Sequence, residues 1–308
     1  MRNKSPEISV IVCSYNTKDV TLKCLERLKE SEDYLGRLVE IIVIENGTDG
    51  TAAAVTEEFP WIKILMPGEN LGFAKGNNLG IKESDKNSKY YLFLNSDALV
   101  KEDTLKKACE FMENHNNCGV VSCKLRLENG KSQPNGGYLP TPFLVATWIL
   151  GIDLLPGVRH FLHAFHQKDN KFFESDRKVG WVMGAFLFMK REVIEKTKGF
   201  DESFFMYMEE VEWERRICDA GFTIWFTSGF EITHLDKTSS RGDPEKFRKI
   251  FQNEILGVVY FLKKYYPNQI FWTLPVIKLG LIARIVGFSI LGNKLRQDVY
   301  LQTFRELK

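Results

Sequence analysis

Short apolar runs alternate with segments of helical periodicity over the first 125 residues. The runs typical of buried strands are residues 8–13, 41–44, 62–65, 90–94 and 120–123. Between them, apolar positions recur on one helical face at residues 20–28, 51–59, 73–83 and 102–115. Strands that alternate with helices of this length predict an α/β fold, with a mainly parallel sheet flanked by helices and joined by right-handed crossovers.

The second half of the chain is less regular. Residues 130–177 are rich in Gly, Pro and Asn, which predicts an irregular excursion of the kind that often carries specificity. Strands are expected again at 185–189, at 223–226 and at the approach to His234, with a helix at 209–220 that ends at Gly221. From residue 244 the pattern is mostly helical. We therefore predict an α/β domain over 1–240 and a helical C-terminal region over 241–308.

One apolar stretch of the helical region, residues 270–292, has the length of a membrane span. Pro275, Lys278 and Arg284 lie within it, and two cations near the middle of a bilayer are costly. Packing of this helix onto the α/β domain is therefore the favoured interpretation. Three alternatives stay open: the region is an acceptor platform, it is a homodimer interface, or residues 270–296 contact an anionic membrane surface peripherally.

Composition and charge narrow the function classes. Hydrophobic residues make up 44% of the chain and charged residues 27%, as in ordinary globular proteins, and the net charge is +2. This balance gives no electrostatic basis for binding nucleic acid. The six cysteines form no C-x-x-C pair and fit no zinc spacing, and the polar N-terminus does not have the pattern of a signal peptide. A reducing, cytoplasmic location is expected.

Polar residues follow four of the predicted strands at the point where each strand ends. These segments are Ser14-Tyr15-Asn16, Glu45-Asn46-Gly47-Thr48-Asp49, residues 70–78 and Asn95-Ser96-Asp97. The carboxyl ends of parallel strands share one edge of a sheet, and ligands bind at that edge. Lys75 can meet a phosphate there, and Asp97 can hold a divalent cation that in turn holds a diphosphate. The four segments together predict a nucleotide pocket.

Three motifs extend this picture. They are Asn95-Ser96-Asp97, the run N-L-G-F-A-K-G-N-N at residues 70–78, and the run G-F-D-E-S-F-F-M-Y-M-E-E-V-E at residues 199–212. With them the chain resembles the inverting glycosyltransferases of family 2, which have the Rossmann-like GT-A fold. The resemblance covers roughly residues 7 to 240. It is strongest to the rhamnosyltransferase-like branch, which builds bacterial surface polysaccharides.

The resemblance implies a role for each matching residue. Asp97 is the expected metal ligand and His234 a further one, for Mn²⁺ or Mg²⁺, while Glu210 occupies the position of the catalytic base. The residues expected to contact the nucleotide sugar are Ser14, Tyr15, Asn16, Glu45, Asn46, Asn70, Gly72, Lys75, Asn78, Asn95, Ser96 and Asp97. Those expected on the sugar and acceptor side are Trp181, Gly184, Ala185 and Glu209.

The expected activity is transfer of a sugar from a nucleotide sugar to a glycan or a lipid-linked acceptor, with dTDP-L-rhamnose as the first candidate donor and a UDP-hexose as the second. Glu45 and Glu210 each stand where the family usually has Asp, which motivates an alternative: a catalytically inactive glycan-binding or scaffold protein. A sugar-nucleotide pyrophosphorylase is disfavoured, because no Gly-rich phosphate loop follows the first strand. Without the resemblance, the acids from Glu209 to Glu214 would also suit a solvated helix start.

Overall fold

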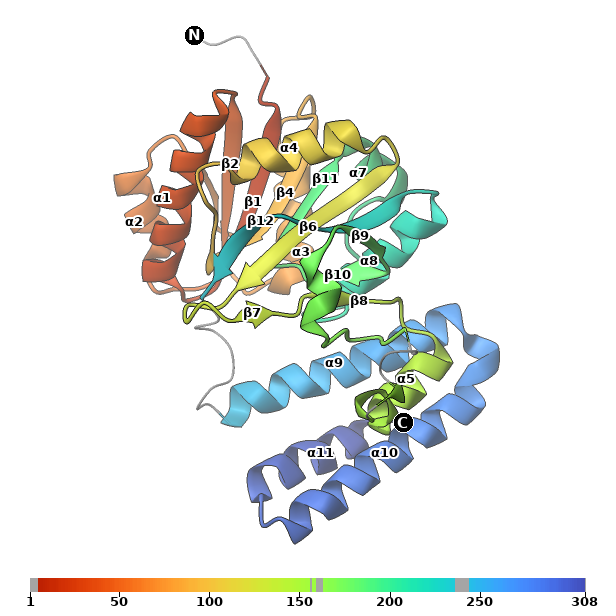
Figure 1. Cartoon of the computed structure of the whole chain (residues 1–308). Helices are drawn as coiled ribbons and strands as arrows, with labels where there is room; N and C mark the ends of the chain where they lie inside the picture. Colours follow the sequence, from red (N-terminus) through yellow and green to blue (C-terminus); the bar gives the residue numbers. More distant parts are fainter. Residues whose placement is uncertain (1–4, 156, 159–162, 236–243, 308) are drawn as a thin grey trace. The chain divides into compact units, whose positions relative to one another are not determined.

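The computed structural model describes residues 5–155, 157–158, 163–235 and 244–307 (Figure 1). These residues form two compact units. The first contains the chain up to Gly136, Lys168–Phe205 and the stretch from Glu209 to residue 235, and the second contains Gly137–Gln167, Met206–Met208 and residues 244–307. The domain boundary expected at residue 240 lies outside the described residues and stays a prediction.

The first unit is built on a mixed, mainly parallel sheet (Figure 1). Its strands follow the order β3 (Lys63–Leu65), β2 (Val39–Glu45), β1 (Ile8–Ser14), β4 (Tyr90–Asn95), β11 (Phe186–Lys190), β6 (Cys118–Arg126), β12 (Thr223–His234) and β5 (Ala98–Leu99). Strand β7 (Ser132–Gln133) pairs with β6, and β9 (Arg177–Val179) pairs with β12. A separate small sheet joins β8 (Gly136–Gly137) to β10 (Trp181–Val182).

Strand direction within the sheet follows from the connections. The pairs β1–β2, β1–β4, β2–β3 and β6–β12 are parallel, as the alternating pattern predicts. Strand β11 is antiparallel to both β4 and β6. The chain leaves β6 at its carboxyl end and passes through the irregular stretch at residues 130–177 before it enters β11. No crossover helix of this unit carries the chain back to the other end of the sheet, so β11 runs in the opposite direction to β6.

Side chains that alternate along the strands divide the core between the two faces of the sheet. The helices that cover these faces are α1 (Lys18–Leu35), α2 (Thr51–Glu58), α3 (Gly72–Glu83), α4 (Thr104–Asn114), α7 (Arg191–Thr197) and α8 (Glu209–Asp219), with a short 3₁₀ turn η2 (Asn170–Glu174). Val10 and Val12 belong to one buried cluster together with Leu25 of α1 and Leu105 of α4. Ile11 points to the other face, where it lies against Gly80 of α3.

The predicted elements are present, but several differ in extent; strand β6, expected at 120–123, spans Cys118–Arg126. The helix expected at 20–28 continues to Leu35, where Gly36 with φ +66° ends it in the left-handed conformation. The strands expected at 223–226 and at His234 are one strand, β12, whose register shifts between Thr227 and Glu231. A bulge of this kind lets a long strand bend while it stays paired.

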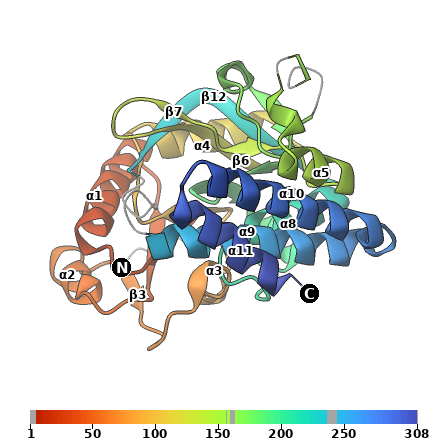
Figure 2. The same cartoon turned by 90° about the horizontal axis from the view of Figure 1, so that it is seen from below.

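The second unit is helical. Its elements are α5 (Pro142–Ile149), η1 (Ile152–Leu154), α9 (Pro244–Tyr265), η3 (Pro267–Gln269), α10 (Ile270–Ile290) and α11 (Lys294–Glu306) (Figure 2). Helix α10 crosses α5 closely at Gly280, where an added Cβ would lie 2.8 Å from the carbonyl oxygen of Ile149. Arg284 donates hydrogen bonds to the carbonyls of Trp148 and Ile149 at the C-terminus of α5, so this cation caps a helix.

Helix α10 with its preceding turn, Pro267–Ile290, is long and apolar enough to cross a membrane by length and composition alone. Of its apolar stretch, 22% is buried. The packing of this helix against the α/β domain stays a prediction.

Candidate functional site

The carboxyl ends of β1, β2 and β4 lie side by side. Ser14 of β1 pairs with Glu45 of β2, and Cys13 pairs with Asn95 of β4. The Asn95 N–H donates to the carbonyl of Ala185 at 3.2 Å, which places the start of β11 at the same edge. Three of the polar segments singled out in the sequence therefore share one edge of the sheet.

Asp97 and His234 face each other at this edge. The end of β12 runs antiparallel to β5, with His234 opposite Ala98. Asp97 Oδ1 lies 3.2 Å from His234 Nε2, and both side chains are buried. His234 Nδ1 lies 2.8 Å from Oε1 of Gln133. An amide oxygen accepts, so Nδ1 donates to Gln133, and the ring is oriented with Nε2 on the side of Asp97.

A carboxylate and a neutral imidazole nitrogen form a donor set for a divalent cation, and oxygen-rich sites of this kind suit Mn²⁺ or Mg²⁺. Among the described residues, however, no group of three or more His, Cys, Asp or Glu side chains gathers to hold a metal ion. Asp97 and His234 therefore fit such an ion only if a ligand, such as the diphosphate of a donor, supplies the remaining oxygens.

The hydroxyl groups near Asp97 form a connected set. Ser96 Oγ lies 3.0 Å from Thr17 Oγ1, which in turn lies 3.2 Å from Ser14 Oγ. Tyr15, which follows Ser14 in the sequence, is exposed. Asn16, in the left-handed conformation at φ +53°, accepts the Thr48 N–H at 2.9 Å. This contact joins the loop after β1 to the loop after β2.

Glu45 and Asn46 organise the end of β2. Glu45 is 4% exposed, and its Oε1 accepts the Gly47 N–H at 2.6 Å. Its Oε2 has no hydrogen bond to any described residue. Burial raises the pKa of Glu45. The Asn46 amide bonds to Leu71 N–H and Gly72 C=O, at 3.4 and 3.3 Å, and so holds the segment at residues 70–78 beside β2.

That segment turns sharply into α3. Asn70 Oδ1 accepts the Gly72 N–H at 2.9 Å. Gly72 has φ +73°, and an added Cβ would lie 2.4 Å from the carbonyl oxygen of Phe205. The same carbonyl accepts the Phe73 N–H at 3.0 Å. Lys75 is exposed in the first turn of α3.

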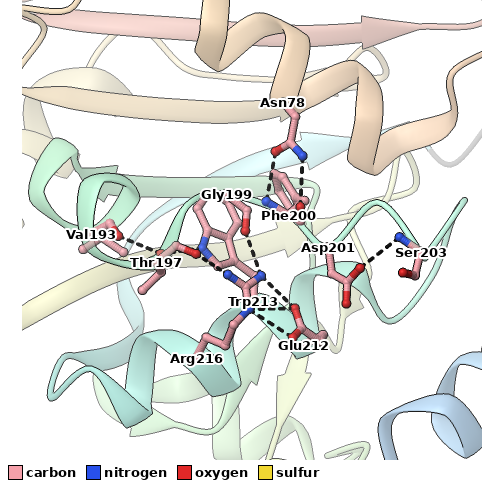
Figure 3. A network of polar contacts seen from close by, with 10 residues as sticks. All are labelled: Asn78, Val193, Thr197, Gly199, Phe200, Asp201, Ser203, Glu212, Trp213 and Arg216. Carbon is pink, nitrogen blue, oxygen red and sulfur yellow. Dashed lines mark hydrogen bonds and ion pairs between the residues drawn. The ribbon is translucent and has the colours of Figure 1, made fainter. Parts of the chain in front are cut away.

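Asn78 links α3 to the segment before α8. Its Oδ1 accepts the Phe200 N–H and its Nδ2 donates to the Phe200 carbonyl, both at 2.9 Å (Figure 3). An added Cβ on Gly199 would lie 2.6 Å from Asn78 Oδ1. The amide of Asn78 is thus engaged with the backbone, and its expected contact with the donor stays a prediction.

Helix α8 is fixed by a polar network around Arg216 (Figure 3). Arg216 forms an ion pair with buried Glu212 at 2.7 Å and donates to the Gly199 carbonyl at 2.7 Å. Trp213 Nε1 donates to Thr197 Oγ1 at 2.6 Å. Glu209, Glu212 and Glu214 are all buried, so these acids do not form a solvated helix start.

The remaining acid, Glu210, is half-buried beside the segment at residues 181–184. Gly184 N–H lies 3.5 Å from Glu210 Oε1. Neighbouring Glu209 is 4% exposed, and burial together with the charge of Glu210 raises the pKa of Glu209 well above its usual range. Trp181 and Ala185 are also buried on this side. Glu210 is thus the more accessible of the two adjacent carboxylates.

Two residues of this region were missed by the sequence reasoning. Gln133 carried no signal, because it lies in the excursion and only β7 places it beside His234. Glu214 did carry a signal in the sequence, because it stands four residues after Glu210 and therefore lies on the same face of the predicted helix.

Comparisons with known proteins identify the family of this chain. The family model described as "Glycosyl transferase family 2" matches residues 9–198. The N-acetylglucosaminyl-diphospho-decaprenol L-rhamnosyltransferase of Mycobacterium tuberculosis (strain CDC 1551 / Oshkosh) is 25% identical, over 68% of this chain and 70% of its own length. Rhamnosyltransferase WbbL of Escherichia coli (strain K12) is 23% identical, over 83% of this chain and 93% of its own.

Solved structures confirm the fold. The mannosyltransferase PcManGT of Pyrobaculum calidifontis, in complex with GDP-Man and Mn²⁺, matches with a TM-score of 0.57 at 16% identity. The match covers 98% of this chain and 87% of the PcManGT chain. TarS of S. aureus, in complex with UDP-GlcNAc, has a TM-score of 0.53 at 16% identity, over 98% of this chain and 81% of its own. The expected GT-A fold is therefore correct. Since the family match covers more than half of the sequence, this chain belongs to glycosyl transferase family 2 and is a glycosyltransferase.

Proposed function

We propose that this glycosyltransferase moves L-rhamnose from dTDP-L-rhamnose, or a hexose from a UDP-hexose as the second candidate, to a glycan or lipid-linked acceptor of a surface polysaccharide. The observation that carries the proposal is the Asp97–His234 pair at the shared edge of β1, β2 and β4. The rhamnosyltransferases among the relatives favour rhamnose as the sugar.

The donor side of the proposal rests on the residues at that edge. Asp97 and His234 would hold Mn²⁺ or Mg²⁺, which supplies a Lewis acid for the charge that builds up on the departing diphosphate. Glu45 and Asn46 lie at the carboxyl end of β2, where they can accept and donate hydrogen bonds to the nucleoside. The free lone pairs of Glu45 Oε2 suit a ribose hydroxyl.

The acceptor side rests on Glu210. A single displacement at the anomeric carbon inverts its configuration and needs one carboxylate to take the proton of the attacking hydroxyl. Glu210 is partly exposed, whereas Glu209 is buried and favours its protonated form. Retention through a covalent intermediate would need a carboxylate nucleophile at the anomeric carbon instead.

We also propose that the protein works at the cytoplasmic face of the membrane. Residues 255–297 contain no Asp or Glu, and their cations are Lys263, Lys264, Lys278, Arg284, Lys294 and Arg296. On α10, exposed Phe271, Leu279 and Val286 share one face of the helix. An apolar stripe with basic surroundings suits an anionic lipid surface. A homodimer through the same stripe is the competing use.

The test is a thermal-shift panel of nucleotide sugars with and without Mn²⁺, followed by a transfer assay with the donor that binds. A ligand that binds only the folded state raises the melting temperature. We expect a metal-dependent shift with one donor, and release of its nucleoside diphosphate when acceptor is added. Glu210→Gln should keep the shift and lose about 10²–10⁴-fold in kcat. Donor binding without transfer by the wild type would favour the inactive scaffold, and no shift with any donor would contradict the proposal.

A further inference from the structure

Glu214 is a buried acid one helical turn beyond Glu210, and it has no cationic partner. It is 2% exposed, and no Lys, Arg or His among the described residues lies within ion-pair distance of it. Arg216 on the same helix pairs with Glu212 instead. A carboxyl group in such a place is either held by hydrogen bonds or loses its charge.

The hydrogen bonds of Glu214 go to the backbone of the segment beside Glu210. Val182 N–H lies 3.1 Å from each carboxyl oxygen of Glu214, and Gly184 N–H lies 3.5 Å from Glu210 Oε1. Residues four apart on a helix share a face, and N–H groups two apart in an extended segment point the same way. The carboxyl groups of Glu210 and Glu214, one helical turn apart, therefore meet the N–H groups of Gly184 and Val182 on the same side of the extended segment.

The intervening N–H points to the opposite side. Met183 N–H donates to the carbonyl of Asn135 at 2.9 Å. Asn135 is 1% exposed, and its Nδ2 donates to the carbonyl of Cys123 in β6 at 2.8 Å. The segment is thus held between the sheet on one side and the carboxyl groups of α8 on the other.

We propose that Glu214 is a positioning residue for the transfer reaction, which holds residues 182–184 against α8 and thereby fixes Glu210 relative to Gly184. The inference rests on the proposed function, in which Glu210 is the base. A base displaced by about 1 Å can lose about 100-fold in rate, so the Glu214 contact matters although this residue does not touch the substrate.

The surroundings of Glu214 favour its protonated form. Burial raises the pKa of Glu214 well above its usual range, and the charge of Glu210 raises it further. Cys218, one turn along α8, is half-buried, and burial raises its thiol pKa to about 11. When Glu214 is neutral, the negative charge of the two carboxyl groups, Glu210 and Glu214, resides on Glu210.

The charged groups on the elements packed against α8 have partners elsewhere. These pairs are Arg191 with Glu195 and Lys196 with Glu192 on α7, Glu231 of β12 with Lys101 and Arg126, and His234 of β12 with Asp97. None of them supplies a cation to Glu214.

The test compares Glu214→Gln with Glu214→Leu in the full chain. Gln is neutral and keeps an oxygen for the Val182 N–H, whereas Leu has a similar size and cannot accept. Asp219→Asn, at the exposed end of the same helix, is the control. We expect Glu214→Leu to lower kcat about 100-fold with the donor KM within twofold, and Glu214→Gln to stay within threefold of wild type.

The fall of kcat at constant donor KM is the readout that a purely structural role would not give, and the pH dependence of kcat/KM tests the charge state of Glu214. With a neutral Glu214, the acid limb of Glu214→Gln coincides with that of the wild type. A shift of that limb toward lower pH by one unit or more, or loss of donor affinity and kcat together in Glu214→Leu, would overturn the proposal. If the Leu variant does not fold, Glu214→Asp replaces it, because a carboxyl group one methylene shorter loses the 3.1 Å contact with the Val182 N–H and should lower kcat in the same way.

The proposed function is judged separately, by donor binding and transfer in the wild type. If the wild type transfers sugar and a folded Glu214→Leu variant transfers it equally well, only the positioning role is contradicted. A wild type that binds no donor would end both proposals.

Discussion

His234 Nδ1 lies 2.8 Å from the side-chain oxygen of Gln133, on the side of the ring away from Asp97. Gln133 belongs to β7, which pairs with β6, so a residue of the excursion sets the orientation of an imidazole at the end of β12. This contact orients the ring so that Nε2 lies beside Asp97.

Removal of this support should weaken metal binding. We expect Gln133→Leu to lower the affinity for Mn²⁺, measured by calorimetry in the presence of nucleoside diphosphate, by about 10–100-fold, because the ring loses its hydrogen-bond acceptor. Ser132→Ala, the adjacent residue of β7, is the control and should bind as the wild type does. Equal affinity in all three proteins would show that Gln133 does not orient the ligand.

Gly72 should tolerate no side chain. Its φ of +73° disfavours any L-residue, and an added Cβ would meet the Phe205 carbonyl at 2.4 Å. We expect Gly72→Ala to lower the free energy of unfolding by about 2–4 kcal/mol, measured by urea titration, because the strain and the clash add. It should also weaken donor binding, since the turn before Lys75 must shift.

A matched glycine separates the two contributions. Gly68 has φ +82°, but an added Cβ there meets nothing within 4 Å. Gly68→Ala should therefore cost only about 1 kcal/mol, from the left-handed conformation alone. Similar losses in the two variants would mean that the contact with Phe205 has no energetic importance.

The sequence predicted the fold and the shared edge of the candidate site because both depend on local patterns. Apolar runs marked β1, β2 and β4, and parallel pairing then required Ser14, Glu45 and Asn95 to share an edge. The antiparallel direction of β11 did not follow from the same reasoning, since strand direction depends on how the excursion returns, which no periodicity encodes.

The supporting residues were harder to predict for the same reason. The contact of Gln133 with His234 spans 101 positions, and that of Val182 with Glu214 spans 32. Neither contact follows from helix or strand spacing, because each requires the register of a short strand in an irregular stretch. Side chains at strand ends could be inferred from the sequence, whereas those that orient them could not.

The buried acid of α8 should make stability depend on pH. The folded-state pKa of Glu214 is raised, so between about 4.3, the ordinary value, and that raised pKa the folded chain holds a proton that the unfolded chain has released. Its contribution is fully present below about pH 4.3 and is lost as pH rises. Glu214→Gln does not titrate, so the wild type's free energy of unfolding should fall relative to that of the variant from pH 5 to pH 8 in urea titrations. A difference that stays constant across this range would mean that Glu214 is ionised in the folded state.

Helix α10 should bind anionic vesicles through its exposed stripe. Leu279 and Val286 are 58% and 52% exposed, in a stretch without acidic residues, so we expect the Leu279→Glu, Val286→Glu double variant to lose at least about tenfold in binding to phosphatidylglycerol-containing vesicles in a flotation assay. Tyr34→Glu with Trp61→Glu is the matched control, because these aromatic residues are equally exposed on the first unit. The control should bind as the wild type does, and neutral vesicles should bind all proteins weakly. If the stripe variant instead keeps vesicle binding and converts a dimer into a monomer in light scattering, the stripe is an interface between two copies of the chain.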